Sequence, residues 1–113
     1  SNLIIGNNCH IGKNCFFDLR DKVIIEDNVI ISMQTTFITH TDMNKSDLRI
    51  FYPASQAPVR VGKNTYIGAN STILQGVNIG ENCVLAAASV VIGNIPSNTM
   101  VGGVPAKFIR SLK

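Results

Sequence analysis

Two histidines are the side chains of this 113-residue sequence best suited to acid–base chemistry. His40 ends the run TTFIT and begins a long polar stretch, so a strand can hold the ring while it still reaches solvent. Free histidine has a pKa of about 6.5, which suits a general base near neutral pH. His10 lies at a bend where a polar side chain is unremarkable, and we expect it to be a surface residue. The sequence therefore offers one candidate catalytic base, His40.

Three cysteines, Cys9, Cys15 and Cys83, are an odd number and form no CxxC pair. We therefore expect neither a disulfide framework nor a cysteine zinc site. Each cysteine stands at the fifth position of a six-residue window, where a small side chain fits a narrow interior. We interpret them as small hydrophobes in a reducing compartment, and we expect a cytoplasmic protein.

A six-residue repeat must position these side chains. Nine windows carry an aliphatic residue at position one and a small or β-branched residue at position five. Six of them have Asn at position four, and Asn tolerates the left-handed backbone of a tight bend. Three windows would close one triangular turn, and stacked turns would form a parallel β-solenoid. The windows are IGNNCH (5–10), IGKNCF (11–16), IEDNVI (25–30), ISMQTT (31–36), VGKNTY (61–66), IGANST (67–72), ILQGVN (73–78), IGENCV (79–84) and LAAASV (85–90).

Two segments interrupt the repeat. FFDLRDKV (16–23) shifts the frame by two residues and predicts a small surface excursion. The polar segment that follows His40 contains two prolines and fits no window, which predicts a protruding, structureless loop over about 41–58. Long loops on a compact scaffold usually carry function.

The C-terminal tail, about 102–113, follows a final short strand that we expect to start at Pro96. Val104, Phe108 and Leu112 are four residues apart and would form one apolar stripe if the tail were helical. Because a solenoid end exposes backbone groups, we expect this tail to cap the end.

Composition restricts the class of protein further. The length fits one domain, 1–113, and 45% apolar residues can build a core. Charged residues are only 15%, against about 25% in a typical soluble domain, which indicates an extended or shared surface. A net charge of +3 without interleaved aromatic residues does not indicate nucleic-acid binding. No apolar run is long enough to span a membrane.

From Thr39 to Arg110 the sequence resembles the hexapeptide-repeat O-acetyltransferases, which include maltose, galactoside, xenobiotic and capsular-polysaccharide acetyltransferases. The matching segments, in order, are THT (39–41), VGKNTYIGANSTILQGVNIGENCVLAAASVV (61–91) and IPSNTMVGGVPAKFIR (95–110). The resemblance implies an all-β, left-handed parallel β-helix. It also implies a homotrimer with active sites between subunits, and acetyl-CoA as the acyl donor.

The same resemblance implies roles for individual residues. His40 would deprotonate a hydroxyl of a sugar or polysaccharide precursor, which attacks the thioester directly. A backbone amide near Ala69 would stabilise the oxyanion. The pantetheine arm would run past Ala69 and Ala87, and its phosphates would meet Lys107 and Arg110. A solvated tail is the alternative interpretation of the two cations.

Five further residues are candidates for substrate binding. Asp18 is similar to a carboxylate that binds the acceptor or orients the histidine in some relatives, and an Asx-type turn is the other interpretation. Asp42, in the loop, could touch the acceptor, as could its neighbours Asn44 and Tyr52. Tyr66 stands where many relatives have Trp and would form an aromatic wall.

This sequence also departs from the family pattern. Thr41 replaces a common Pro, and Ile92-Gly93 replaces a common Thr-Lys pair. The maltose and galactoside enzymes carry an N-terminal helical segment, whereas this sequence begins almost directly in the repeat, so we expect that segment to be absent or to have been removed. A glycan or glycolipid intermediate is therefore a better expected acceptor than a small free sugar.

Other functions on the same scaffold stay open. An N-acyltransferase acting on an amino sugar also needs a base near the thioester, and a non-catalytic β-helix platform needs none. A zinc carbonic anhydrase of γ type needs about three histidine ligands per site, which two histidines per chain do not supply. We therefore expect no metal.

Overall fold

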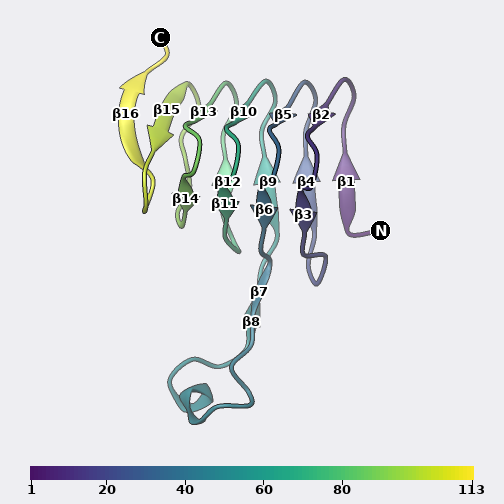
Figure 1. The fold of residues 1–113 in the computed structure, drawn as a ribbon, viewed down its shortest axis with the longest axis vertical. Coiled ribbons are helices and arrows are strands. Elements are labelled where there is room, and N and C mark those ends of the chain that lie inside the picture. Colours follow the sequence, from purple (N-terminus) through teal and green to yellow (C-terminus); the bar gives the residue numbers. More distant parts are fainter.

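The six-residue windows form short strands separated by tight bends, and three windows make one coil of a solenoid (Figure 1). The computed structural model describes residues 1–113. The strands stack into three faces. Face A contains β1 (Leu3–Ile5), β4 (Val23–Ile25), β9 (Val59–Val61) and β12 (Asn78–Ile79). Face B contains β2 (His10–Ile11), β5 (Ile30–Ile31), β10 (Tyr66–Ile67), β13 (Val84–Leu85), β15 (Thr99–Gly102) and β16 (Lys107–Ser111). Face C contains β3 (Phe16–Phe17), β6 (Thr36–Phe37), β11 (Thr72–Ile73) and β14 (Val90–Val91).

The bends have the backbone conformation that their sequence predicts. The six Asn residues at position four all have φ between 56° and 62°, in the left-handed region. They are Asn8, Asn14, Asn28, Asn64, Asn70 and Asn82. Gln34 and Ala88 occupy the same position in two other windows and also have φ of 60°. The window position therefore dictates the backbone, and Asn is the residue that adopts it at least cost.

The core is a stack of the position-one side chains. In face B, Ile31, Ile67, Leu85 and Val101 lie in register from coil to coil, and all four are buried. Phe37 and Ile73 stack in the same way in face C. The parallel pairing places each aliphatic side chain directly on its neighbour, so one repeated residue type fills the interior.

The position-five side chains fill the corners and bond to the next coil. Thr65 Oγ1 donates to the carbonyl oxygen of Gly80 at 3.0 Å, and Cys83 Sγ donates to that of Pro96 at 3.2 Å. Cys9 Sγ donates to the carbonyl oxygen of Glu26 in the same way. All three cysteines are free, and burial raises the pKa of the Cys83 thiol. The packing interpretation of the cysteines is confirmed, with a weak hydrogen bond added.

An arm leaves the solenoid where the long loop was expected (Figure 1). The loop is not structureless, because β7 (His40–Thr41) and β8 (Ser55–Gln56) pair as an antiparallel ribbon. A short 3-10 helix, η1 (Asp47–Ile50), forms at its far end, where the Ser46 side chain accepts a hydrogen bond from Leu48 N–H. These bonds satisfy backbone groups that an unstructured loop would leave to water. The helix η1 has only four residues, and the structure contains no helix that could span a membrane.

The C-terminal tail is a strand, which corrects the helical interpretation. β16 pairs antiparallel with β15, and β15 itself starts at Thr99 rather than at Pro96. Gly103, with φ of +102°, allows the chain to reverse between the two strands. The outer edge of β15 offers unpaired N–H and C=O groups, and pairing them outweighs the four-residue apolar spacing of the tail.

Candidate active site

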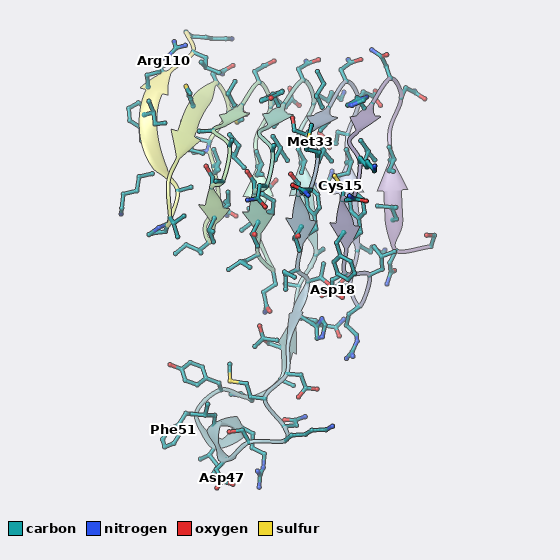
Figure 2. All side chains as sticks on the ribbon, in the orientation of Figure 1. Cys15, Asp18, Met33, Asp47, Phe51 and Arg110 are labelled. Carbon is teal, nitrogen blue, oxygen red and sulfur yellow. The ribbon has the colours of Figure 1, made fainter.

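His40 lies at the base of the arm, where the chain leaves its second coil after β6. The excursion after β3, in the first coil, brings Asp18 to the same corner (Figure 2). Asp18 Oδ2 is 2.5 Å from His40 Nδ1. The His40 side chain is 32% exposed and that of Asp18 only 12%. The carboxylate is therefore held behind the ring, while the ring reaches the surface.

Asp18 accepts several hydrogen bonds. Its Oδ2 also accepts from the backbone N–H of Thr39 at 2.9 Å, and its Oδ1 accepts from Arg20 N–H at 3.1 Å. Burial raises the pKa of Asp18, but the hydrogen bonds from Thr39, His40 and Arg20 outweigh it and lower the pKa from 3.8 to about 2. Asp18 is therefore ionised at neutral pH.

The negative charge on Asp18 determines which nitrogen of the neutral His40 ring carries the proton. An ionised carboxylate only accepts hydrogen bonds, so Nδ1 must carry the proton that lies between the two side chains. In the neutral ring Nε2 then has a free lone pair, which is what a general base needs. Both interpretations of Asp18 hold at once, because it closes an Asx-type turn with Arg20 N–H and orients His40. Its contact with a substrate stays a prediction.

A polar cavity of about 220 Å³ opens beside His40. Its other lining residues are Arg20, Thr41, Asp42, Ala54, Ser55 and Gln56. The expected substrate residue Asp42 thus lies in the same cavity as His40, and its Oδ1 accepts from Asn44 N–H at 2.8 Å. Tyr52 is exposed on the arm and does not line the cavity.

A hydrogen-bonded chain fixes the base of the arm to the solenoid. Thr41 Oγ1 donates to Gln75 Oε1 at 2.8 Å, and Gln75 Nε2 donates to Ser55 Oγ at 2.9 Å. On the other side, Gln56 Nε2 donates to Asp21 Oδ2 at 3.2 Å. Sequence reasoning missed Asp21, Ser55, Gln56, Gln75 and Arg20, because no local pattern marks segments that meet only after the coils stack.

The expected donor residues lie at a different edge. Ala69 and Ala87 occupy corresponding bends between faces B and C, stacked by the bond from Ala88 N–H to the Ala69 carbonyl oxygen at 2.8 Å. The N–H groups of Ala69 and Ala87 donate no hydrogen bond within the chain. These bends precede the strands of face C, whereas His40 follows them. One chain therefore does not bring His40 together with Ala69 and Ala87.

The remaining candidates belong to face B. Tyr66 points outward from β10, half-exposed, and its hydroxyl accepts from Ser32 Oγ at 3.1 Å. Lys107 and Arg110 are exposed on β16, without an ion pair. Lys107 also lines a cavity of about 340 Å³ at the C-terminal end of the core, together with Ile92 and Gly93. His10 is exposed on β2, as expected.

The sequence profile described as "Hexapeptide repeat of succinyl-transferase" matches residues 2–33 and 58–93. Galactoside O-acetyltransferase of Escherichia coli is 33% identical over 113 residues, covering 95% of this chain and 56% of that protein. A hexapeptide-repeat acetyltransferase of Vibrio cholerae superimposes with a TM-score of 0.91 at 35% identity, covering 99% of this chain and 64% of that one. In its complex with acetyl-CoA it superimposes with a TM-score of 0.88 at 34% identity, over 99% and 61% of the two chains. The chain thus spans somewhat more than half the length of these relatives, and the left-handed parallel β-helix expected from the sequence is confirmed.

Proposed function

This chain belongs to the hexapeptide-repeat family, and on that premise we propose that it transfers an acetyl group from acetyl-CoA to a hydroxyl of a sugar or polysaccharide precursor. The observation that carries the proposal is the His40–Asp18 pair beside a polar cavity. A solenoid used only as a platform has no need of an ionised carboxylate behind a partly exposed imidazole.

The chemistry follows from the ring's orientation. His40 Nε2 takes the proton of the acceptor hydroxyl while that oxygen attacks the thioester carbonyl carbon. The tetrahedral intermediate collapses, the carbon–sulfur bond breaks, and the thiolate takes the proton from the imidazolium. The products are the acetyl ester and free coenzyme A. Asp18 stabilises the imidazolium and keeps the ring in the correct tautomer, and no acyl-enzyme forms.

The donor would lie along the edge that carries Ala69 and Ala87. Two features support this placement, the small side chains and the N–H groups without a partner in the chain. The Ala69 N–H is the proposed donor to the oxyanion, a type of contact worth about 3–4 kcal/mol. Lys107 and Arg110, exposed on β16, are the proposed contacts of the coenzyme phosphates.

The site would be completed by a second copy of the chain, in a homotrimer. The base and the donor edge lie at opposite ends of the face C strands, so one copy's His40 edge must meet a neighbour's Ala69 edge. Such a head-to-tail contact closes into a ring if its rotation is threefold. The low charged fraction of 15% supports a shared surface. We also propose a cytoplasmic location, which the odd number of cysteines without a CxxC pair supports.

Titration of the purified protein with acetyl-CoA by calorimetry tests whether the protein binds the proposed acyl donor. We expect about one site per chain, retained in the variant His40→Ala. The acceptor half is tested by acetyl transfer to a panel of hydroxyl and amino sugars, with His10→Ala as the matched control because His10 is exposed on β2. Loss of transfer in His40→Ala alone supports the proposal. Transfer only to amino groups would make the protein an N-acyltransferase, and no acetyl-CoA binding by a trimer would leave the platform function.

A further inference from the structure

Arg20 lies on the wall of the His40 cavity, and its guanidinium makes no ion pair or hydrogen bond within the chain. It is the one Lys or Arg among the residues that line this cavity. Arginine keeps its positive charge at every physiological pH. A permanent positive charge therefore lies in the wall of the cavity beside the proposed base.

The backbone on both sides of Arg20 is fixed to the residue that precedes His40. Arg20 N–H donates to Asp18 Oδ1, and Thr39 Oγ1 donates to the Asp18 carbonyl oxygen at 3.0 Å. Thr39 Oγ1 also accepts from Asp21 N–H at 3.0 Å, and Thr39 is fully buried. The turn from Asp18 to Asp21 is thus held at each end by one hydroxyl. This arrangement fixes the Cα of Arg20 relative to His40 and leaves the side chain free for a ligand.

The carboxylates around the cavity have other partners. Asp18 holds His40, and Asp21 accepts from Lys22 N–H through Oδ1 and from Gln56 through Oδ2. Asp42, also in the wall, accepts from Asn44 N–H and makes no ion pair with Arg20. The guanidinium is therefore available, and its planar fork suits a carboxylate held by two parallel hydrogen bonds.

We propose that the acceptor carries a carboxylate, which Arg20 binds while a hydroxyl of the same molecule lies at His40 Nε2. The inference rests on the proposed function and names the acceptor class as hydroxyl-bearing sugar acids of the uronic type. Ser55 and Gln56, in the same cavity wall, offer polar groups to the remaining hydroxyls. A phosphate of acetyl-CoA has similar chemistry, so the test must separate acceptor from donor.

The test compares methyl β-galactopyranoside with methyl β-galacturonopyranoside, which differ only in oxidation of C6 to a carboxylate. Initial rates of acetyl transfer are measured for the wild type, Arg20→Gln, Arg20→Lys and Lys63→Gln. Lys63→Gln removes the same charge from an exposed bend residue that does not line the cavity. We expect the wild type to prefer the carboxylate member by about 10- to 100-fold in kcat/KM, since charged hydrogen bonds have that strength. Arg20→Gln should lose this preference through a higher KM, Arg20→Lys should regain part of it, and Lys63→Gln should keep it.

Binding measurements cover the case in which neither sugar is acetylated. Calorimetry with the protein saturated by coenzyme A should then show the galacturonide, and not the galactoside, binding to the wild type and losing affinity in Arg20→Gln. The inference is overturned if the wild type uses or binds the two sugars equally. It is also overturned if Arg20→Gln binds acetyl-CoA more weakly but keeps the wild-type sugar preference, since Arg20 would then contact the donor. The proposed function fails separately, if the wild type does not bind acetyl-CoA at all.

Discussion

Replacing Asp18 by Asn keeps the shape of the side chain and removes the negative charge behind His40. The Asn amide can donate to His40 Nδ1, which would move the ring proton to Nε2 and block the proposed base. We expect kcat/KM for acetyl transfer to fall about 100- to 10,000-fold, because a misplaced tautomer removes general-base catalysis. Acetyl-CoA affinity should not change, since Asp18 is not on the donor edge.

The same substitution, Asp18→Asn, should also lower the stability of the fold. The pKa of Asp18 is about 2 in the folded chain, against an ordinary value of 3.8. At about 1.4 kcal/mol per pH unit, this difference stabilises the fold by about 2 kcal/mol. Because the folded pKa is the lower one, the stabilisation is present above pH 3.8 and is lost as the pH falls towards 2. Asp18→Asn should therefore be less stable by about 2 kcal/mol at pH 7, with the difference shrinking between pH 4 and 2.

Urea unfolding at several pH values, beside initial-rate measurements, checks both effects. The matched control is Asp47→Asn, which removes the same charge from a side chain that is 97% exposed on the arm. We expect the control to change stability by less than about 0.5 kcal/mol. The reasoning is wrong if Asp18→Asn keeps its activity within a few-fold, or if its loss of stability is independent of pH.

Three further predictions concern the bends and the assembly. Ala88→Asn should raise the free energy of unfolding by about 1 kcal/mol in urea titrations, because Ala88 has φ of 60°; a loss of stability would contradict this. Gly68→Ala should lower the free energy of unfolding by about 1–3 kcal/mol and weaken acetyl-CoA binding, since the new Cβ would lie 2.6 Å from Ala87 N. The control Gly93→Ala, whose Cβ would have no atom within 4 Å, should leave both nearly unchanged. If the two substitutions behave alike, the close packing at Gly68 is not the cause. Mixing His40→Ala and Ala69→Trp chains should restore activity to about a quarter of wild type, because a site between subunits draws one intact edge from each chain. Mixed trimers without activity would place both residues of a site in one chain.

The repeat made the solenoid predictable from the sequence. A six-residue period and Asn at the bends are local signals, since each window sets its own backbone and its neighbours only repeat it. Asn64 and Asn82 adopt φ of 61° and 56° as their window position predicts. The cysteines could be interpreted for the same reason, because window position five fixes what surrounds a side chain.

The tail and the arm were predictable only in part, because distant pairing decides them. The spacing of Val104 and Phe108 favours a helix, but β15 presents an unpaired edge that the tail satisfies as strand β16. The two ends of the arm, His40–Thr41 and Ser55–Gln56, pair with each other although the segment fits no repeat. Neither outcome is visible in local residue preferences, since the partner strand lies elsewhere in the fold.

The sequence by itself determined the solenoid and its bends, and it singled out His40 as the proposed base. Only the tertiary structure decided what surrounds that histidine. Asp18 and His40 are 22 residues apart and meet because one coil stacks on the next. The same stacking brings Arg20 into the cavity wall and separates His40 from Ala69 by one face of the solenoid. Side chains from different coils become neighbours only when the coils are closed and stacked, and no local pattern encodes that contact.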